Sequence, residues 1–295
     1  MSYVLGIILA IGAGCVNSVG LLMQKKVIND HLENPEFLKQ IAQNPMWITG
    51  LVLQVLLGGA FFYILAQIYL GPALVPGLMS AGLILLAIGS IKILNESLKK
   101  KEIIGILMMI LGILFISFSE LSVDVATYNI LDPGFIIRIT MFTGIYIVII
   151  IGIFVYLRKT AKLKGLIYAL ISGFIYSLGS FWIATVSAFL THLFSGSFIL
   201  EEIFLFIPSL IIVILGTAYG IIYAQKSFKE GQVNILSPLI GVPGQVTPLL
   251  AYFLVFLLAP PNTLSLWYII VGLLLVILSS FLLASRQAKL EEIET

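Results

Sequence analysis

Long runs of apolar residues alternate with short polar segments along the whole chain. A helix that crosses the hydrocarbon core of a membrane needs about 20 apolar residues, because each residue adds about 1.5 Å of length. Nine runs meet this requirement, at residues 3–23, 46–70, 73–94, 103–119, 135–157, 165–190, 203–225, 233–258 and 266–285. The pattern predicts an all-α polytopic membrane protein with about nine transmembrane helices, and a short surface helix at 35–43.

The composition supports this class. Hydrophobic residues make up 60% of the 295 residues and charged residues only 10%, whereas water-soluble domains carry about 25% charged residues. Cys15 is the single cysteine, which excludes an intramolecular disulfide and a cluster of thiolate ligands. The chain lacks a Gly-x-x-x-x-Gly-Lys-Ser/Thr phosphate-binding loop, which argues against ATP-driven pumping. We therefore expect neither an enzyme nor a bound cofactor.

Basic residues predict the orientation in the membrane. When successive spans cross the membrane in opposite directions, fifteen of the sixteen Lys and Arg residues fall on one side of the membrane, and only Arg138 falls on the other. The positive-inside rule places the basic side in the cytoplasm. We expect the N-terminus outside, the C-terminus in the cytoplasm and, in a prokaryote, a location in the plasma membrane. Arg138 is expected to extend its side chain to the outer lipid headgroups.

An internal repeat relates the two parts of the chain. At an offset of 159 residues, Gly6, Ile8, Ala10, Gly14, Ser18 and Gly20 match Gly165, Ile167, Ala169, Gly173, Ser177 and Gly179. The matched copies begin five spans apart, an odd number, so the second copy enters the membrane from the opposite face. We expect two inverted four-helix repeats, over residues 1–119 and 164–295, joined by a linking helix within 120–163.

Two spans contain helix-breaking residues at corresponding places. Proline removes an intrahelical hydrogen bond and frees carbonyls that lipid cannot satisfy, so such backbone must face protein or water. The predicted breaks are Pro72, Pro76 and Gly77 in the third span, and Pro238, Gly241, Pro243 and Gly244 in the eighth. We expect a substrate site near the membrane midplane where these spans meet. The alternative is a kinked helix that only packs around its neighbours.

Uncharged polar residues are the candidate substrate ligands, because no carboxylate lies within any of the apolar runs. The pairs Asn17-Ser18 and Tyr176-Ser177 occupy matched positions of the repeat and are expected to face a shared cavity. The alternative is close packing, since small residues recur every four positions. The other candidates lie near the predicted breaks, in the second span or towards the end of the seventh: Gln54, Tyr63, Gln67, Ser80, Tyr219, Tyr223, Asn234, Ser237 and Gln245.

Over nearly its whole length the chain resembles the drug/metabolite transporter superfamily, with EamA-like half-repeats, and more narrowly the NIPA-type magnesium transporters. The residues that carry this resemblance are Gln24-Lys25-Lys26, Pro72-Ala73-Leu74-Val75-Pro76, Leu94-Asn95-Glu96 and Asp132-Pro133-Gly134-Phe135. The resemblance implies nine spans and a secondary transporter. Family members carry an acidic residue in the second span, where this chain has Gly58-Gly59-Ala60.

The resemblance also implies that the transporter moves magnesium or another small cation by alternating access. Magnesium retains several of its waters when it binds to proteins, so the amides of Asn17, Gln54, Gln67 and Asn234 could hold a hydrated ion. An exporter of small organic metabolites or amines is the alternative, because the aromatic candidates and Trp182 could contact an organic cation. A third hypothesis is a non-transporting structural membrane protein, which would lack a water-filled cavity.

The expected partners are membrane lipids and a small-molecule or ion substrate, with a homodimer left open. A nucleic-acid partner is not expected, because membrane topology and anionic lipids account for the basic face. Trp47 and Trp267, at span ends, are expected to anchor the protein at the membrane interfaces.

Charged residues near the span ends have expected structural roles. Lys92 and Glu96 are four residues apart and can pair on one helix face, and a role in a gate is the alternative. Asp132 and Pro133 fit the N-cap and the first position of the fifth span.

Replacing Asn234 or Gln67 with Ala is expected to lower transport without lowering expression. The Ala66-Gln67 pair that closes the second span matches the Ala224-Gln225 pair that closes the seventh, and Asn234 lies at the start of the proline-rich eighth span. Transport and membrane expression of each variant would be compared with those of the parent chain. Unchanged transport in both variants would remove these residues from the substrate site.

Overall fold

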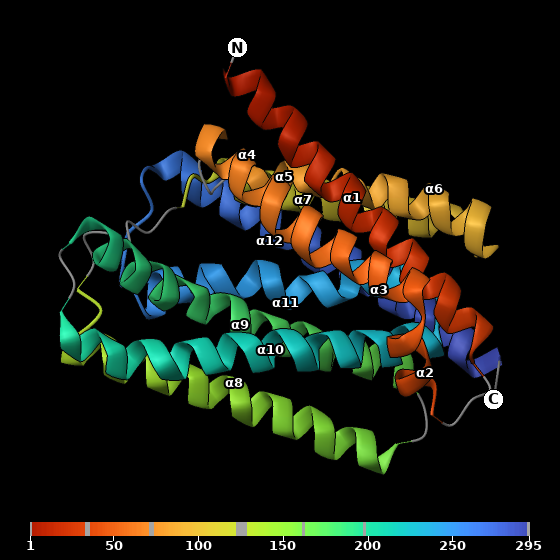
Figure 1. Cartoon of the computed structure of the whole chain (residues 1–295). Helices are drawn as coiled ribbons and strands as arrows, with labels where there is room; N and C mark the ends of the chain where they lie inside the picture. The colour runs from red at the N-terminus through yellow and green to blue at the C-terminus, as the bar shows by residue number, and fades with distance from the viewer. Residues whose placement is uncertain are drawn as a thin grey trace.

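The computed structural model describes residues 2–32, 36–70, 74–121, 129–160, 163–196 and 199–293, which form a bundle of helices (Figure 1). Nine stretches of these residues are long and apolar enough to span a membrane, which confirms the prediction. The first four are α1 (Ser2–Asp30); α3, η1 and α4 (Pro45–Val52, Leu53–Phe62 and Tyr63–Leu70); α5 and α6 (Val75–Met79 and Gly82–Leu94); and α7 (Lys100–Phe118). The last five are α8 (Pro133–Lys159), α9 (Lys164–Ser195), α10 (Ile203–Glu230), α11 (Val233–Leu254) and α12 (Thr263–Ile293). The predicted surface helix is α2 (Phe37–Gln43), and a 3-10 turn, η2 (Leu200–Glu202), precedes α10.

The first and last helices place the two chain termini at opposite ends of the bundle (Figure 1). One end, here called the basic end, holds the last turns of α1, α6, α10 and α12 and the first turns of α7, α9 and α11. Lys25 and Gly231 meet there, as do Glu102 and Arg286. The opposite end is called the far end. We call α1 to α7 the N-terminal half and α9 to α12 the C-terminal half, with α8 between them in the sequence.

The middle of the second span is not a regular α-helix. The segment η1 is a ten-residue π-helical stretch between α3 and α4. Such wide turns are rare and occur frequently at functional sites. Gly58 in η1 packs against α1, where an added Cβ would lie 3.0 Å from both the carbonyl oxygen of Ala13 and the amide nitrogen of Asn17. The π-helical stretch therefore brings the second span close to Asn17.

The third span is interrupted by a turn at Ser80 and Ala81, between α5 and α6. Pro76, a predicted break residue, lies instead in the first turn of α5. The N–H groups of a first turn have no partner within the helix, so a proline there removes no intrahelical hydrogen bond. Pro72 lies outside the described residues. The turn is located where α1 approaches most closely, and Gly82 begins α6 directly after it.

The eighth span, α11, is one continuous helix that includes Pro238, Pro243 and Pro248, so the break expected there does not occur. Each proline lacks the N–H group that would bond to the carbonyl four residues earlier. Gly241 and Gly244 lie between the prolines, and a Cβ added to either would meet no atom within 4 Å. This side of α11 therefore faces open space, where water can satisfy the freed carbonyls.

Close backbone contacts hold α1 against the third span. A Cβ added to Gly14 would clash with the carbonyl oxygen of Met79, and one added to Gly82 would clash with the carbonyl oxygen of Gly14. The Ser18 hydroxyl donates a hydrogen bond to the carbonyl oxygen of Gly82 at 2.7 Å. Small residues permit this approach between helices in membranes. The small-residue spacing in the first span therefore serves packing.

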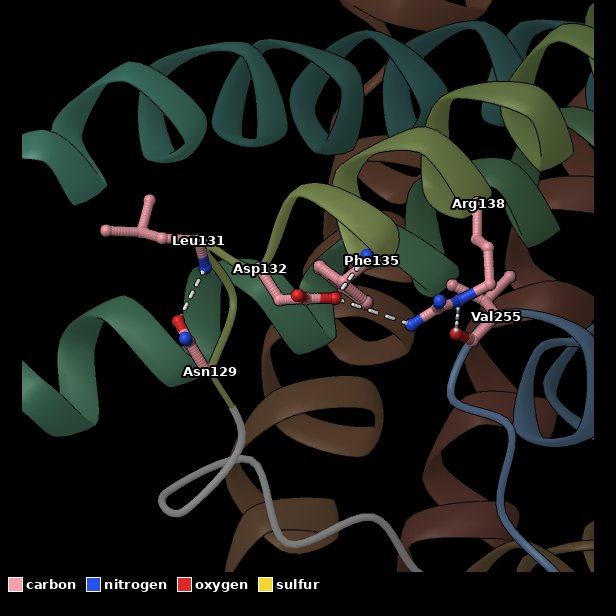
Figure 2. Close-up of polar contacts among 6 residues, drawn as sticks. All are labelled: Asn129, Leu131, Asp132, Phe135, Arg138 and Val255. Carbon is pink, nitrogen blue, oxygen red and sulfur yellow. Dashed lines mark hydrogen bonds and ion pairs between the residues drawn. The ribbon is translucent and has the colours of Figure 1, made fainter.

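The start of α8 is bonded to the end of α11. Asp132 is the N-cap of α8, as predicted, and its carboxylate accepts a hydrogen bond from the Phe135 amide at 2.7 Å (Figure 2). Arg138 was expected to extend to lipid headgroups, and this expectation is wrong. Its Nε donates to the carbonyl oxygen of Val255 at 2.8 Å, and its guanidinium lies 3.8 Å from the Asp132 carboxylate. The guanidinium therefore bonds to a carbonyl that α11 leaves unpaired at its C-terminal end.

Two further bonds attach α8 to the C-terminal half. The Trp182 indole donates to the Thr143 hydroxyl at 3.0 Å, and the hydroxyls of Tyr146 and Thr247 are 2.6 Å apart. Trp182 thus contributes to packing between α8 and α9. Trp267 is exposed near the start of α12.

Gly14→Ala is expected to lower the thermal unfolding temperature in detergent, because the added methyl group meets the Met79 backbone. Overpacking of this kind costs about 1–3 kcal/mol. Gly12→Ala is the matched control, since the same substitution two residues away meets no atom within 4 Å. Equal unfolding temperatures for the two variants would contradict the described packing of α1.

Candidate functional site

A cavity of about 960 Å³ lies between the N-terminal and C-terminal halves. Its wall is formed by α1, η1, α4 to α7, α9 and α11 together with the turn between α5 and α6. The predicted polar residues that line it are Asn17, Ser18, Tyr63, Ser80, Ser237 and Gln245, and the predicted break residues that line it are Pro76, Pro238, Gly241 and Gly244. The structure thus brings together residues from the first, second, third and eighth spans.

A smaller cavity of about 140 Å³ adjoins the large one and shares Asn17 and Ser237 with it. Two more predicted residues, Gln54 and Tyr176, line this smaller space. Gln225 and Phe228, in the last turns of α10, line it as well. The smaller cavity therefore extends from the large cavity towards the basic end.

Several predicted residues lie away from both cavities. Ser177 is buried and donates to the carbonyl oxygen of Gly173 at 2.6 Å. Tyr219 is 52% exposed on the outer side of α10, and the ring of Tyr223 contacts Phe154 of α8 with centroids 5.2 Å apart. These residues occupy the surface or the packing layers of the bundle.

The other predicted residues outside the cavities have packing or structural contacts. Gly77 packs against Ser117, and Pro243 packs against Gly173. Asn234 is buried at the basic end, where its side-chain amide donates to the Ser90 hydroxyl at 3.0 Å. The side chain of Gln67 lies outside the described part of the structure.

The cavity wall also contains polar residues that sequence reasoning missed: Ser117, Ser119, Ser180, Ser187 and Tyr252. A lone serine in an apolar span is usually assigned to helix packing, which is why these were overlooked. A signal was present for Ser180 and Ser187, because residues seven apart lie on one face of a helix.

The polar groups of the wall are uncharged. Within the described part of the chain, no Asp, Glu, Lys, Arg or His lines the large cavity. No group of three or more His, Cys, Asp or Glu side chains is placed to hold a metal ion among the described residues. A cation in this cavity would therefore meet hydroxyl and amide oxygens together with apolar side chains.

A chain of side-chain amides crosses between the halves at the basic end. The Gln24 amide nitrogen donates to Gln54 Oε1 at 2.7 Å, and the Gln225 amide nitrogen donates to Gln24 Oε1 at 2.7 Å. Trp47 was expected at the membrane interface, but it is buried and its indole donates to Gln225 Oε1 at 3.1 Å. These bonds join α1, α3 and η1 to α10.

Lys25 and Glu96, both buried, add charged contacts between the halves at the same end. The Lys25 ammonium donates to the carbonyl oxygens of Phe228 and Gly231, the latter at 2.8 Å. Glu96 accepts hydrogen bonds from the amides of Val233, at 2.8 Å, and Asn234, at 3.3 Å, at the start of α11. The Lys25 ammonium therefore caps the C-terminal end of α10, and the Glu96 carboxylate caps the N-terminal end of α11.

Glu96 does not form the pair with Lys92 that its spacing suggested. The helix α6 ends at Leu94, and Asn95 has a φ of 56°, so Glu96 leaves the helix face on which Lys92 lies. Burial raises the pKa of the Glu96 carboxyl, while its backbone N–H partners and the nearby Lys25 ammonium act in the opposite direction.

The large cavity extends from the middle of the bundle to the far end. Its wall includes Ser237 of α11 on the side of the basic end, and Ser119 and Leu121 just beyond the C-terminal end of α7. Ser187 and Tyr252, in the far parts of α9 and α11, continue the wall there. The bonds of Gln24, Lys25 and Glu96 thus close one end of the interface between the halves, and the cavity occupies the other.

One of three comparisons with known proteins found a match. The family model described as Magnesium transporter NIPA matches residues 1–289, nearly the whole chain. The comparisons with curated proteins and with solved structures gave no match. The length of the family match and the nine apolar helices among the described residues lead to one conclusion: the chain belongs to the NIPA magnesium transporter family and is a multi-pass membrane transporter.

Proposed function

We propose that the protein is a secondary transporter that moves magnesium, or another small cation, by alternating access around the central cavity. The observation that carries this proposal is the position of the cavity between two halves. Within the described residues, the contacts of Gln24, Lys25 and Glu96 join the halves at the basic end of the cavity, and α7 and α12 pack against each other between the halves. Rocking of the halves about the cavity would open the basic end and close the far end. The family match supports the magnesium assignment.

The basic end corresponds to the cytoplasmic side under the positive-inside rule. The N-terminus then lies outside and the C-terminus lies in the cytoplasm, in the plasma membrane if the source is a prokaryote. In this orientation the structure represents an outward-facing state. The bonds made by Gln24, Lys25 and Glu96 form the closed cytoplasmic gate.

Matched contacts support two inverted repeats, over residues 1–119 and 164–295, with a linking span within 120–163. Gly14 of α1 contacts the third span, and its repeat partner Gly173 of α9 contacts the eighth, where an added Cβ would lie 2.6 Å from Ile240 O. The fourth and ninth spans contact each other reciprocally. A Cβ added to Gly112 would lie 2.9 Å from Gly272 O, and one added to Gly272 would lie 2.8 Å from Gly112 O.

Export of small organic metabolites or amines is the second candidate function. The apolar part of the cavity wall favours it, because Met79, Met109 and Tyr252 could contact an organic substrate. The volume of the cavity is also within the range of sites for small organic ligands, about 300–1,000 Å³. A purely structural role is disfavoured by the presence of the cavity.

Purified protein in liposomes that contain a magnesium-sensitive dye is expected to give saturable magnesium influx above that of protein-free vesicles. The flux would be measured over a range of imposed membrane voltages. Folded protein that gave no flux would remove magnesium as the substrate and favour the organic alternative, which a screen of amines and amino acids would then test.

Labelling of single cysteines would test the gate. In a Cys15→Ala background, Ser180→Cys is expected to react with a membrane-impermeant thiol reagent from outside, because Ser180 lines the cavity. Adding Gln225→Ala removes the amide that bonds to Gln24. Loss of such a buried hydrogen bond costs about 1–3 kcal/mol, which is about a 5- to 150-fold shift towards the inward-facing state. Slower labelling from outside is the expected result.

Two controls accompany this experiment. Gly144→Cys should not react, because Gly144 is on the exposed side of α8 and would face lipid. Gln43→Ala should leave the labelling rate unchanged, since Gln43 is exposed at the end of α2. Reaction of the Ser180→Cys variant only from the cytoplasmic side would reverse the assigned state.

A further inference from the structure

We propose that the cavity holds its cation with the complete first hydration shell in place, so that the protein recognises the bound water molecules and not the bare ion. This inference rests on the proposed function and specifies the chemical form of its substrate. It depends on the direction of the hydrogen bonds in the wall, on the absence of charged ligands from the described lining, and on the size of the cavity.

Four of the hydroxyl groups of the wall donate their protons to the protein backbone. Ser18 donates to Gly82 O at 2.7 Å, and Ser80 donates to Gly77 O at 2.5 Å. A hydroxyl has one proton and two lone pairs, so each of these oxygens can only accept a further hydrogen bond.

The same direction of donation continues towards the far end. Ser119 donates to Ile116 O at 2.5 Å, and the Tyr252 hydroxyl donates to Ala259 O at 2.9 Å. The side-chain oxygen of Asn17, a residue that lines both cavities, is buried and has no hydrogen-bond partner in the structure. The wall therefore offers a set of hydrogen-bond acceptors that extends along the cavity.

Water bound to a divalent cation directs both of its hydrogens outward and is a strong donor. The acceptor oxygens of the wall match this shell. Magnesium gives up its waters reluctantly, and its usual protein ligands include carboxylates. No carboxylate lines the cavity within the described residues, so little would compensate the loss of hydration.

The size of the cavity does not require the ion to lose water. Six waters about 2.1 Å from magnesium, each with a radius of about 1.4 Å, form a particle about 7 Å across, or roughly 180 Å³. The cavity has a volume of about 960 Å³. The hydrated ion and a layer of further water therefore fit between the two halves.

Hexaamminecobalt(III) tests this inference, because it resembles a hydrated magnesium ion in size and shape and does not exchange its ligands. Its N–H groups point outward as donors, and it cannot bind protein oxygens directly to the metal. In the liposome assay it is expected to inhibit magnesium influx competitively. When the concentration of the complex equals the KM for magnesium, and the complex binds as tightly as magnesium or more tightly, the apparent KM should rise about twofold or more.

A matched pair of serine variants assigns the inhibition to the cavity. Ser80→Ala removes one acceptor of the wall and should weaken inhibition about fivefold, the effect of one hydrogen bond. Ser280→Ala removes a serine that bonds to the carbonyl three residues earlier in the same way, at 2.7 Å, but lies on an exposed helix surface. This control should be inhibited like the parent chain. Both variants would first be checked for unchanged unfolding temperature.

Each result has a defined meaning. Even a weak competitor should inhibit when it is present at about tenfold excess over magnesium. Magnesium flux that is unchanged at this excess of the complex would overturn recognition of the hydrated ion and leave the proposed function in place. Equal inhibition of the Ser80→Ala and Ser280→Ala variants would place the complex outside the cavity and would also overturn the inference. Absence of magnesium flux from folded protein would remove the proposed function and this inference with it.

Discussion

The hydrocarbon interior of a membrane offers no hydrogen-bond partner, so each polar group of this chain must be satisfied by the protein or by enclosed water. Several buried serines satisfy their hydroxyls on the backbone of a neighbouring helix, as Ser172 does with Gly220 O at 2.8 Å and Ser279 with Gly105 O at 2.6 Å. Such bonds require backbones in close contact, which glycine permits. The three prolines of α11, whose missing N–H groups leave carbonyls unpaired, lie on a helix that borders the cavity. Both the close packing of the helices and the cavity beside α11 therefore meet the need of polar groups in the membrane for a hydrogen-bond partner.

The spans were predictable from sequence because each is a local property: the length of an apolar run, and the helix caps at residues such as Asp132. The cavity was predictable only in part. Asn17 and Ser237 were identified through repeat matches and proline positions, whereas Ser117 and Ser119 were not, because a serine on the cavity side and one in a packing layer have the same local sequence signal. The π-helical stretch of η1 also changes which residues of the second span face inward.

Residues that act over long sequence distances were the least predictable. Glu96 was assigned to Lys92, four residues away, yet it bonds to Val233 and Asn234 in the other half. Trp47 was assigned to the lipid interface, yet it bonds to Gln225. Local spacing contains no information about which helix from the other half will lie beside a side chain. The charged groups described here serve the ends of helices, and within the described residues the cavity wall is left with uncharged side chains.

The attachment of α8 divides the bundle unequally. Arg138, Thr143 and Tyr146 tie this helix to α9 and to α11 with its following residue Val255, so in the proposed cycle α8 travels with the C-terminal half. Five spans then move against four. The exposed flank of α8 does not line the cavity and would face lipid. In the proposed cycle, membrane thickness or lateral pressure acting on this flank would bias the position of the larger group of spans. The rate at which the transporter changes state would then depend on the membrane.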